Sequence, residues 1–154
     1  QLDRVLGYME VGVSEGAELV HGGVQLVEGE LARGNFMAPT LFTNVRNDMR
    51  IAREEIFGPV GCVIPFDGVD EAVEIANDSE FGLAAAVWTA DVARAHDVAQ
   101  RIEAGQIYIN DFMPIGVEAP FGGYKSSGTG REKGIESLWH YTQVKTVSVR
   151  TRGA

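Results

Sequence analysis

Two adjacent carboxylates precede an aromatic residue and a Gly-Pro pair in the segment REEIFGPV, residues 53–60. A carboxylate at the edge of an α/β sheet commonly binds a ribose, because two sugar hydroxyl groups donate hydrogen bonds to its two oxygens. Glu54 and Glu55 are therefore candidates for such a contact. The alternative is that both glutamates lie at a solvent-exposed helix end while Phe57 fills the core, and spacing alone favours this alternative.

A glycine-rich segment, APFGGYKSSGTGREKG at residues 119–134, is the second candidate site. Its glycines and Lys125 invite comparison with phosphate-binding loops, in which the backbone approaches the ligand closely. The comparison fails, because the pattern GxxxxGK[ST] is absent and Gly128-Thr129-Gly130 lacks the third glycine of a dinucleotide-binding turn. A loop that turns tightly at its glycines and presents Phe121 to a pocket is a simpler explanation, and binding of ATP is the weakest functional hypothesis.

The chain offers little material for thiol or metal chemistry. Its single cysteine, Cys62, permits no internal disulfide and lies in the apolar run VGCVIPF, where burial is expected to raise the pKa of the thiol. We therefore predict a small core residue there. The three histidines, His21, His96 and His140, show no metal-ligand spacing, and no metal site is predicted.

Composition limits the class of protein. The 154 residues are 45% hydrophobic and 23% charged, which is typical of one soluble globular domain. The net charge of −9 repels phosphate backbones and anionic lipids, so nucleic acid is an unsuitable partner. No apolar run approaches the roughly 20 residues of a membrane-spanning helix, and no export signal is visible at the start. A cytoplasmic location is expected, and the absence of an initiator Met indicates a fragment or a trimmed chain.

Three apolar runs alternate with two amphipathic segments in the middle of the chain. The runs at 60–66, 83–89 and 106–110 predict strands, and the segments at 69–78 and 91–105 predict helices. Strands joined through helices by short connections are usually parallel. The sequence therefore predicts an α/β fold with a parallel sheet between two layers of helices. Within the second helical segment, Asp91 is the expected N-cap and Gly105 the expected residue after the helix end.

The flanking regions do not show this alternation of apolar runs and amphipathic segments. A helix is predicted from Leu2 to Ser14, ending near Gly16, followed by short extended pieces up to residue 45. A long ordered loop is expected over 111–130, and loops of that length usually line a functional site.

The end of the chain completes the predicted elements. A helix over 131–141 should bury Ile135, Leu138 and Trp139, and an edge strand is predicted over 143–150, QVKTVSVR. Such a strand at a terminus is able to pair with a neighbouring subunit.

Several of these segments resemble one known family. APTLFTNVRNDMRIAREEIFGPV, FGLAAAVWTADVARA, AGQIYIND, EAPFGGYKSSGTGREKG and the final YTQVKTVSV are similar, in order and spacing, to the C-terminal part of the aldehyde dehydrogenase superfamily. The resemblance runs from about Gln1 to Val149, and EEIFGP followed by PFGGYKxSGxGRExG is a highly specific combination. It implies that residues 1–141 are a partial catalytic domain and that residues 142–154 form a terminal strand and tail for subunit contact.

The family oxidises aldehydes to carboxylic acids with NAD or NADP, through a cysteine thiolate that attacks the carbonyl and a glutamate that activates water. By resemblance, Glu55 binds the nicotinamide ribose, Phe57 contacts the same part of the cofactor, and Gln1 and Arg4 lie nearby. Phe121 resembles the aromatic residue that walls the substrate entrance. Met113 and Ile115 fall in the variable loop that contributes to specificity.

The family's catalytic cysteine, its glutamate and its Gly-rich NAD turn match no pattern in this chain. The resemblance therefore implies no catalytic residue here, weak or absent cofactor binding, and no aldehyde oxidation by this chain alone. Two hypotheses stay open: a contribution to a homo-oligomeric dehydrogenase, or a folded interaction module without chemistry that associates through QVKTVSVR.

Overall fold

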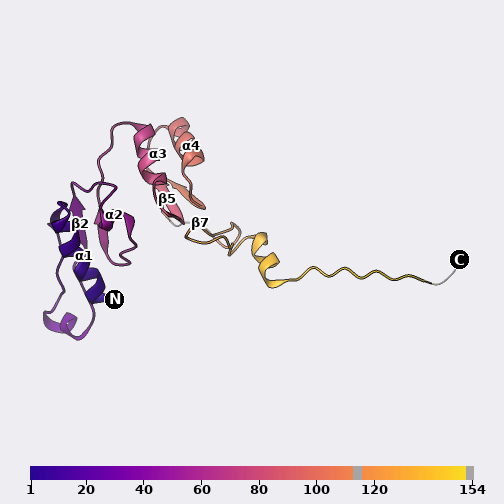
Figure 1. Ribbon diagram of the computed structural model, residues 1–154, viewed down its shortest axis with the longest axis horizontal. Coiled ribbons are helices and arrows are strands. Elements are labelled where there is room, and N and C mark those ends of the chain that lie inside the picture. Colours follow the sequence, from indigo (N-terminus) through magenta and orange to yellow (C-terminus); the bar gives the residue numbers. More distant parts are fainter. Residues whose placement is uncertain (113–115, 152–154) are drawn as a thin grey trace. The chain divides into compact units, whose positions relative to one another are not determined.

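A computed structural model describes residues 1–112 and 116–151. The chain divides into two compact units with the boundary between Ser79 and Glu80 (Figure 1). Within the described residues, no helix is both long enough and apolar enough to cross a membrane.

Unit 1 is built on a three-stranded sheet. Its elements are α1 (Leu2–Ser14), β1 (Glu18–His21), the 3₁₀ helix η1 (Gly29–Arg33), β2 (Thr40–Thr43), α2 (Arg50–Arg53), β3 (Val60–Cys62) and α3 (Val69–Asn77). Strand β2 is central, antiparallel to β1 and parallel to β3. The predicted helices over 2–14 and 69–78 and the extended pieces between them are confirmed.

The core of unit 1 lies between α1 and the sheet. The buried residues are Val5, Tyr8, Met9, Ala17, Phe42, Val45, Met49, Ile51 and Ile56. Phe42 of β2 has no exposed surface, and burial of such a side chain contributes roughly 1.5–3 kcal/mol. Gly12 of α1 allows this contact, because a Cβ there would lie 2.9 Å from the Phe42 ring. Helix α1 ends at Ser14, close to Gly16 as predicted, and the φ of 95° at Gly16 is unfavourable for other residues.

Unit 2 contains a parallel strand pair joined by a helix. Its elements are β4 (Phe81–Gly82), β5 (Ala84–Val87), α4 (Val92–Arg101), β6 (Gln106–Ile109), β7 (Tyr124–Lys125) and the 3₁₀ helix η2 (Ile135–Tyr141). Strands β5 and β6 are parallel and α4 packs against both, while β4 and β7 are antiparallel. The Asp91 carboxylate caps α4 by accepting hydrogen bonds from two backbone N–H groups. The predicted α/β class with parallel strands is confirmed.

The strand predicted over 60–66 is shorter and more exposed than expected. Only Val60–Cys62 form β3, and Val63 and Phe66 are 46% and 61% exposed. Strand β3 pairs with β2 and belongs to a different sheet from β5 and β6. The prediction of burial on both faces was wrong, because β3 lies at the edge of its sheet, where the described residues supply β2 as its one neighbouring strand.

Gly105 has a different role from the one predicted. Helix α4 ends at Arg101, and the next residue, Ile102, is already extended, so Gly105 does not terminate the helix. Its N–H donates to the carbonyl oxygen of Gly82, and a Cβ at this position would lie 1.8 Å from the carbonyl oxygen of Gly122. Glycine is required here by close backbone approach.

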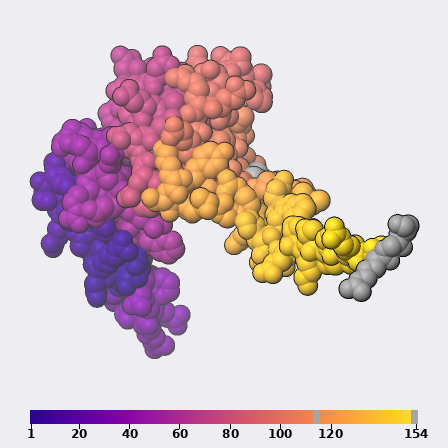
Figure 2. Space-filling view, turned by 45° about the vertical axis from the view of Figure 1, so that its right-hand side comes forward, coloured from indigo at the N-terminus to yellow at the C-terminus, as the bar shows by residue number. Residues whose placement is uncertain are grey.

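The C-terminal segment is exposed. Helix η2 is a 3₁₀ helix, and Ile135, Leu138 and Trp139 are 72%, 59% and 70% exposed, which contradicts their predicted burial. No strand is assigned over the described residues 142–151, so the edge strand predicted over 143–150 is not formed in the single chain. The reason is that a strand needs a neighbour, and these residues lie open to solvent, in yellow in Figure 2.

Candidate cofactor and substrate sites

The N-terminal turns of α1 bind the segment 54–57. The Gln1 side-chain amide donates a hydrogen bond to the carbonyl oxygen of Phe57 at 2.9 Å. The Arg4 guanidinium donates to the carbonyl oxygen of Glu55 at 2.7 Å. The structure therefore brings together all four residues that were predicted to touch a cofactor, although each bonded pair spans more than fifty positions in sequence.

The two adjacent glutamates have different surroundings. Arg50 donates to both carboxylate oxygens of Glu54, at 2.8 and 3.0 Å, and the Tyr8 hydroxyl donates to one of them at 2.8 Å. The Arg50 hydrogen bond, followed by that of Tyr8, lowers the pKa of Glu54 from its usual 4.5 to about 2. The Glu55 carboxylate is exposed and makes no hydrogen bond or ion pair with the part of the chain that the structure describes.

Phe57 is held in an unusual and exposed conformation. Its φ of 53° lies in the left-handed region, which is costly for a bulky residue. Its side chain is 74% exposed, so the alternative in which Phe57 fills the core is wrong. The ring lies at the rim of an open cavity of about 190 Å³ that Gln1 and Met37 also line. An apolar ring presented to solvent in a strained turn is typical of a binding surface.

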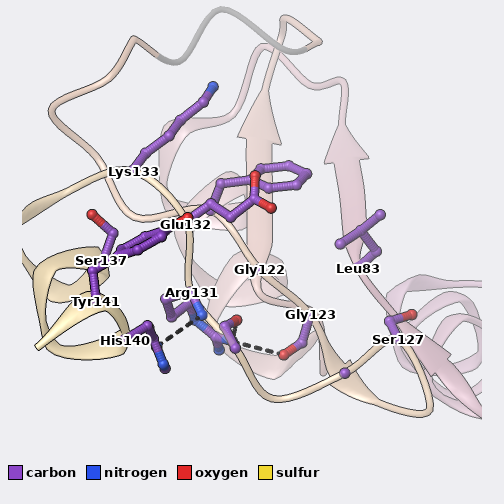
Figure 3. A pocket seen from close by; sticks show the side chains of 13 residues that line it. Leu83, Gly122, Gly123, Ser127, Arg131, Glu132, Lys133, Ser137, His140 and Tyr141 are labelled. Atoms are coloured by element: carbon purple, nitrogen blue, oxygen red, sulfur yellow. Dashed lines mark hydrogen bonds between the residues drawn. The ribbon is translucent and has the colours of Figure 1, made fainter. Parts of the chain in front are cut away.

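A larger cavity of about 730 Å³ lies in unit 2 between the glycine-rich loop and η2 (Figure 3). Phe121, the predicted wall of the substrate entrance, lines it. The backbone groups of Phe121 and Glu132 exchange two hydrogen bonds of 2.7 Å, and the Lys133 ammonium lies 5.7 Å from the centre of the Phe121 ring. The loop thus presents Phe121 to a pocket, as its glycines suggested.

Arg131 fixes the glycine-rich loop. Its guanidinium donates to the carbonyl oxygens of Gly123 and Gly130, both at 2.9 Å, and lies 5.5 Å from the centre of the Tyr124 ring. Its backbone N–H donates to His140, drawn as a dashed line in Figure 3. The helix start predicted at 131–133 is therefore wrong: these residues belong to the loop, and η2 begins only at Ile135.

Two of the predicted substrate-binding residues, Met113 and Ile115, lie outside the described residues. Cys62 is half-buried, its thiol donates to the carbonyl oxygen of Ile51 at 3.4 Å, and burial raises the pKa of the thiol. Among the described residues, no three His, Cys, Asp or Glu side chains form a group able to hold a metal ion.

Sequence reasoning missed Tyr8 and Arg50. A signal was available, because Arg50 precedes Glu54 by four positions, the spacing of a helical ion pair. Likewise Gln1, Arg4 and Tyr8 follow the i, i+3, i+7 pattern that places side chains along one helix face.

Several known proteins are similar to this chain in sequence and fold. The profile of the aldehyde dehydrogenase family matches residues 1–147. A betaine aldehyde dehydrogenase of Brucella anthropi is 55% identical over 150 residues, which are 97% of this chain and 31% of that protein. The betaine aldehyde dehydrogenase of Staphylococcus aureus, solved in complex with NAD+, has a TM-score of 0.88 and 44% identity, over 91% of this chain and 28% of its own.

An aldehyde dehydrogenase of Mycobacterium tuberculosis, complexed with NAD+, has a TM-score of 0.89 and 46% identity, over 99% of this chain and 31% of its own. The chain thus spans about a third of the length of these relatives. Because the family profile covers nearly the whole sequence and the solved relatives share its fold, this chain belongs to the aldehyde dehydrogenase family.

Proposed function

We propose that this chain is part of an NAD-dependent enzyme that oxidises an aldehyde to a carboxylic acid, and that it supplies the ribose contact and one wall of the substrate pocket. The observation that carries the proposal is the contrast between Glu54, whose carboxylate is fully bonded, and Glu55, whose carboxylate is open beside the exposed Phe57 ring. NAD, when bound, accepts the hydride that the aldehyde carbon loses, while water provides the second oxygen of the acid.

The residues present fit the nicotinamide half of the cofactor. The two oxygens of an ionised Glu55 are able to accept hydrogen bonds from the two hydroxyl groups of a ribose. The exposed Phe57 ring offers an apolar surface next to them. The two solved structures described above are NAD+ complexes, which supports NAD rather than NADP.

We further propose that Phe121 borders the space through which the aldehyde enters. An apolar ring at the edge of a large pocket suits a small carbonyl compound attached to an apolar group. Both betaine aldehyde dehydrogenases and an indole-3-acetaldehyde dehydrogenase are among the relatives. These two aldehydes therefore form the first panel for an activity assay of the enzyme that contains this chain.

The chain alone is proposed to be inactive toward aldehydes. Its single thiol belongs to Cys62, which is half-buried beside the core and has a raised pKa, whereas covalent catalysis needs an accessible thiolate. Incubation of this polypeptide with NAD+ and the aldehyde panel should give no increase in NADH absorbance.

The ribose contact is tested by saturation-transfer NMR with nicotinamide riboside, which carries the relevant ribose and detects weak binding. We expect a signal from the ribose protons with the unsubstituted chain and its loss in Glu55→Gln. Glu10→Gln, which removes another exposed carboxylate from α1, is the matched control and should keep the signal. Equal signals from all three proteins would refute the role of Glu55.

A second proposal concerns subunit contact. Val144, Val147 and Val149 are 89%, 76% and 78% exposed, and the described part of their segment has no strand beside it. Pairing with a strand of another copy would satisfy its backbone and cover these side chains. Sedimentation of the chain with and without residues 142–154 tests the idea, since an unchanged molecular mass would refute it.

A further inference from the structure

The contacts between α1 and the segment 54–57 form an ordered series. Tyr8 binds the side chain of Glu54, Arg4 the backbone of Glu55, and Gln1 the backbone of Phe57. The helix and the segment therefore run in opposite directions, and successive positions on one helix face bind successive residues of the segment. Such a series fixes the whole segment rather than one point of it.

Besides these contacts, the segment is held by the side chain of Ile56, which is buried in the core of unit 1. Glu55 and Phe57 are both exposed, and Phe57 adopts a left-handed conformation that an unrestrained chain would leave. At the end of the segment, Gly58 packs closely on α1, because a Cβ there would lie 2.6 Å from a methyl group of Val5. At its start, the Glu54 carboxylate anchors the segment through side-chain hydrogen bonds.

The anchor at Glu54 is unusually complete. Three donor groups bind its two oxygens: two nitrogens of Arg50 and the hydroxyl of Tyr8. The Tyr8 ring is 6% exposed and belongs to the core of unit 1, so its hydroxyl is a fixed point. Arg50 lies in α2, one turn before Glu54, and binds it in the bidentate geometry that restricts both angle and distance.

We propose that Tyr8 and Arg50 are positioning residues, which hold Glu54 so that the next three residues present the Glu55 carboxylate and the Phe57 ring together. This inference rests on the proposed function, in which Glu55 and Phe57 contact the cofactor. Neither Tyr8 nor Arg50 needs to touch the cofactor for this role. A segment that is ordered before binding loses less conformational freedom when the ligand arrives, and affinity is higher for that reason.

The test measures backbone order directly, by the heteronuclear 15N NOE of the Glu55, Ile56 and Phe57 amides in the complete 154-residue chain. Tyr8→Phe removes only the hydroxyl and leaves the ring in the core, and Arg50→Gln removes the bidentate ion pair. We expect both variants to lower the NOE at these three amides, while amides of α1 and β2 stay unchanged. Arg46→Gln is the matched control, because it removes an exposed ion pair with Asp48 elsewhere in unit 1.

The result separates this inference from the proposed function. A loosened segment in Tyr8→Phe and Arg50→Gln, with a rigid one in Arg46→Gln, supports the positioning role; an unchanged segment in both variants overturns it. A merely structural role would lower the urea midpoint without a local change in order. If the segment spends about a tenth to a third of its time in the competent conformation, the affinity for nicotinamide riboside falls about threefold to tenfold. Absence of riboside binding by the unsubstituted chain would count against the proposed function alone.

Discussion

Glu54 and Glu55 have the same side chain, and their partners give them different properties. Arg50 and Tyr8 bind every oxygen of the Glu54 carboxylate, whereas Glu55 meets the helix only through its backbone. The properties of each glutamate therefore depend on which side chains of α1 and α2 lie beside its carboxylate. Sequence reasoning identified Glu55 through a family resemblance, but spacing alone gave no means of separating the two.

The first prediction at this scale concerns acid. The pKa of Glu54 is lower in the folded chain than its usual value, so the ionised form stabilises the fold. That contribution is fully present above about pH 4.5 and is lost as the pH falls through about 2. The difference in unfolding free energy between the unsubstituted chain and Glu54→Gln should therefore shrink across this window in urea titrations. Arg50→Gln should move the lower limit of the window upward, and a difference that stays constant down to pH 2 would contradict the assignment.

The second prediction concerns the left-handed Phe57. Glycine adopts this conformation without strain and a β-branched residue resists it, so Phe57→Gly should be more stable than Phe57→Val by about 1–2 kcal/mol in denaturant unfolding. Phe66 is a suitable control, because it is also exposed but has no positive φ. The order of the two substitutions should be reversed or absent there. The same preference for glycine at both positions would show that Phe57 is not strained.

At the scale of elements, the stability of unit 2 depends on a close backbone contact between the glycine-rich loop and Gly105, the residue before β6. Gly105 lies so near Gly122 that no side chain fits between them. We predict that Gly105→Ala lowers the unfolding free energy by at least about 1–3 kcal/mol, the usual cost of overpacking. Gly130→Ala, in open space within the same loop, is the control and should change it by less than about 1 kcal/mol. Equal effects in thermal unfolding would contradict the contact.

Periodicity predicted the elements whose pattern is local. The helices at 69–77 and 92–101 and the parallel pair β5–β6 follow from apolar spacing and short connections. The partner of β3 and the exposure of η2 did not follow, because an apolar run does not specify which strand or surface lies beside it. The site residues of both units were predicted from motif resemblance, whereas Tyr8 and Arg50 had only a spacing signal, which did not show that both bind Glu54.

At the scale of the whole chain, the prediction concerns the reactivity of its single thiol. Cys62 is the only cysteine in 154 residues, and partial burial raises the pKa of its thiol. Iodoacetamide should therefore label it at least about tenfold more slowly in the folded chain than in urea, since the thiolate is the reactive form. Glutathione in the same two buffers corrects for the effect of urea, and Cys62→Ser should take up no label. Rapid labelling of the folded chain would contradict this prediction and would indicate that Cys62 is an accessible nucleophile.

The exposed segment 142–151 also differs from the rest of the chain in the sign of its charge. It carries Lys145 and Arg150 and no acidic side chain, whereas the net charge of the chain is −9. When two copies meet, this basic arm is drawn toward the other molecule while their acidic remainders repel each other, over distances of about 8–10 Å in ordinary buffers. Dissolved ions weaken both forces, so the rate of the encounter depends on the ionic strength of the medium.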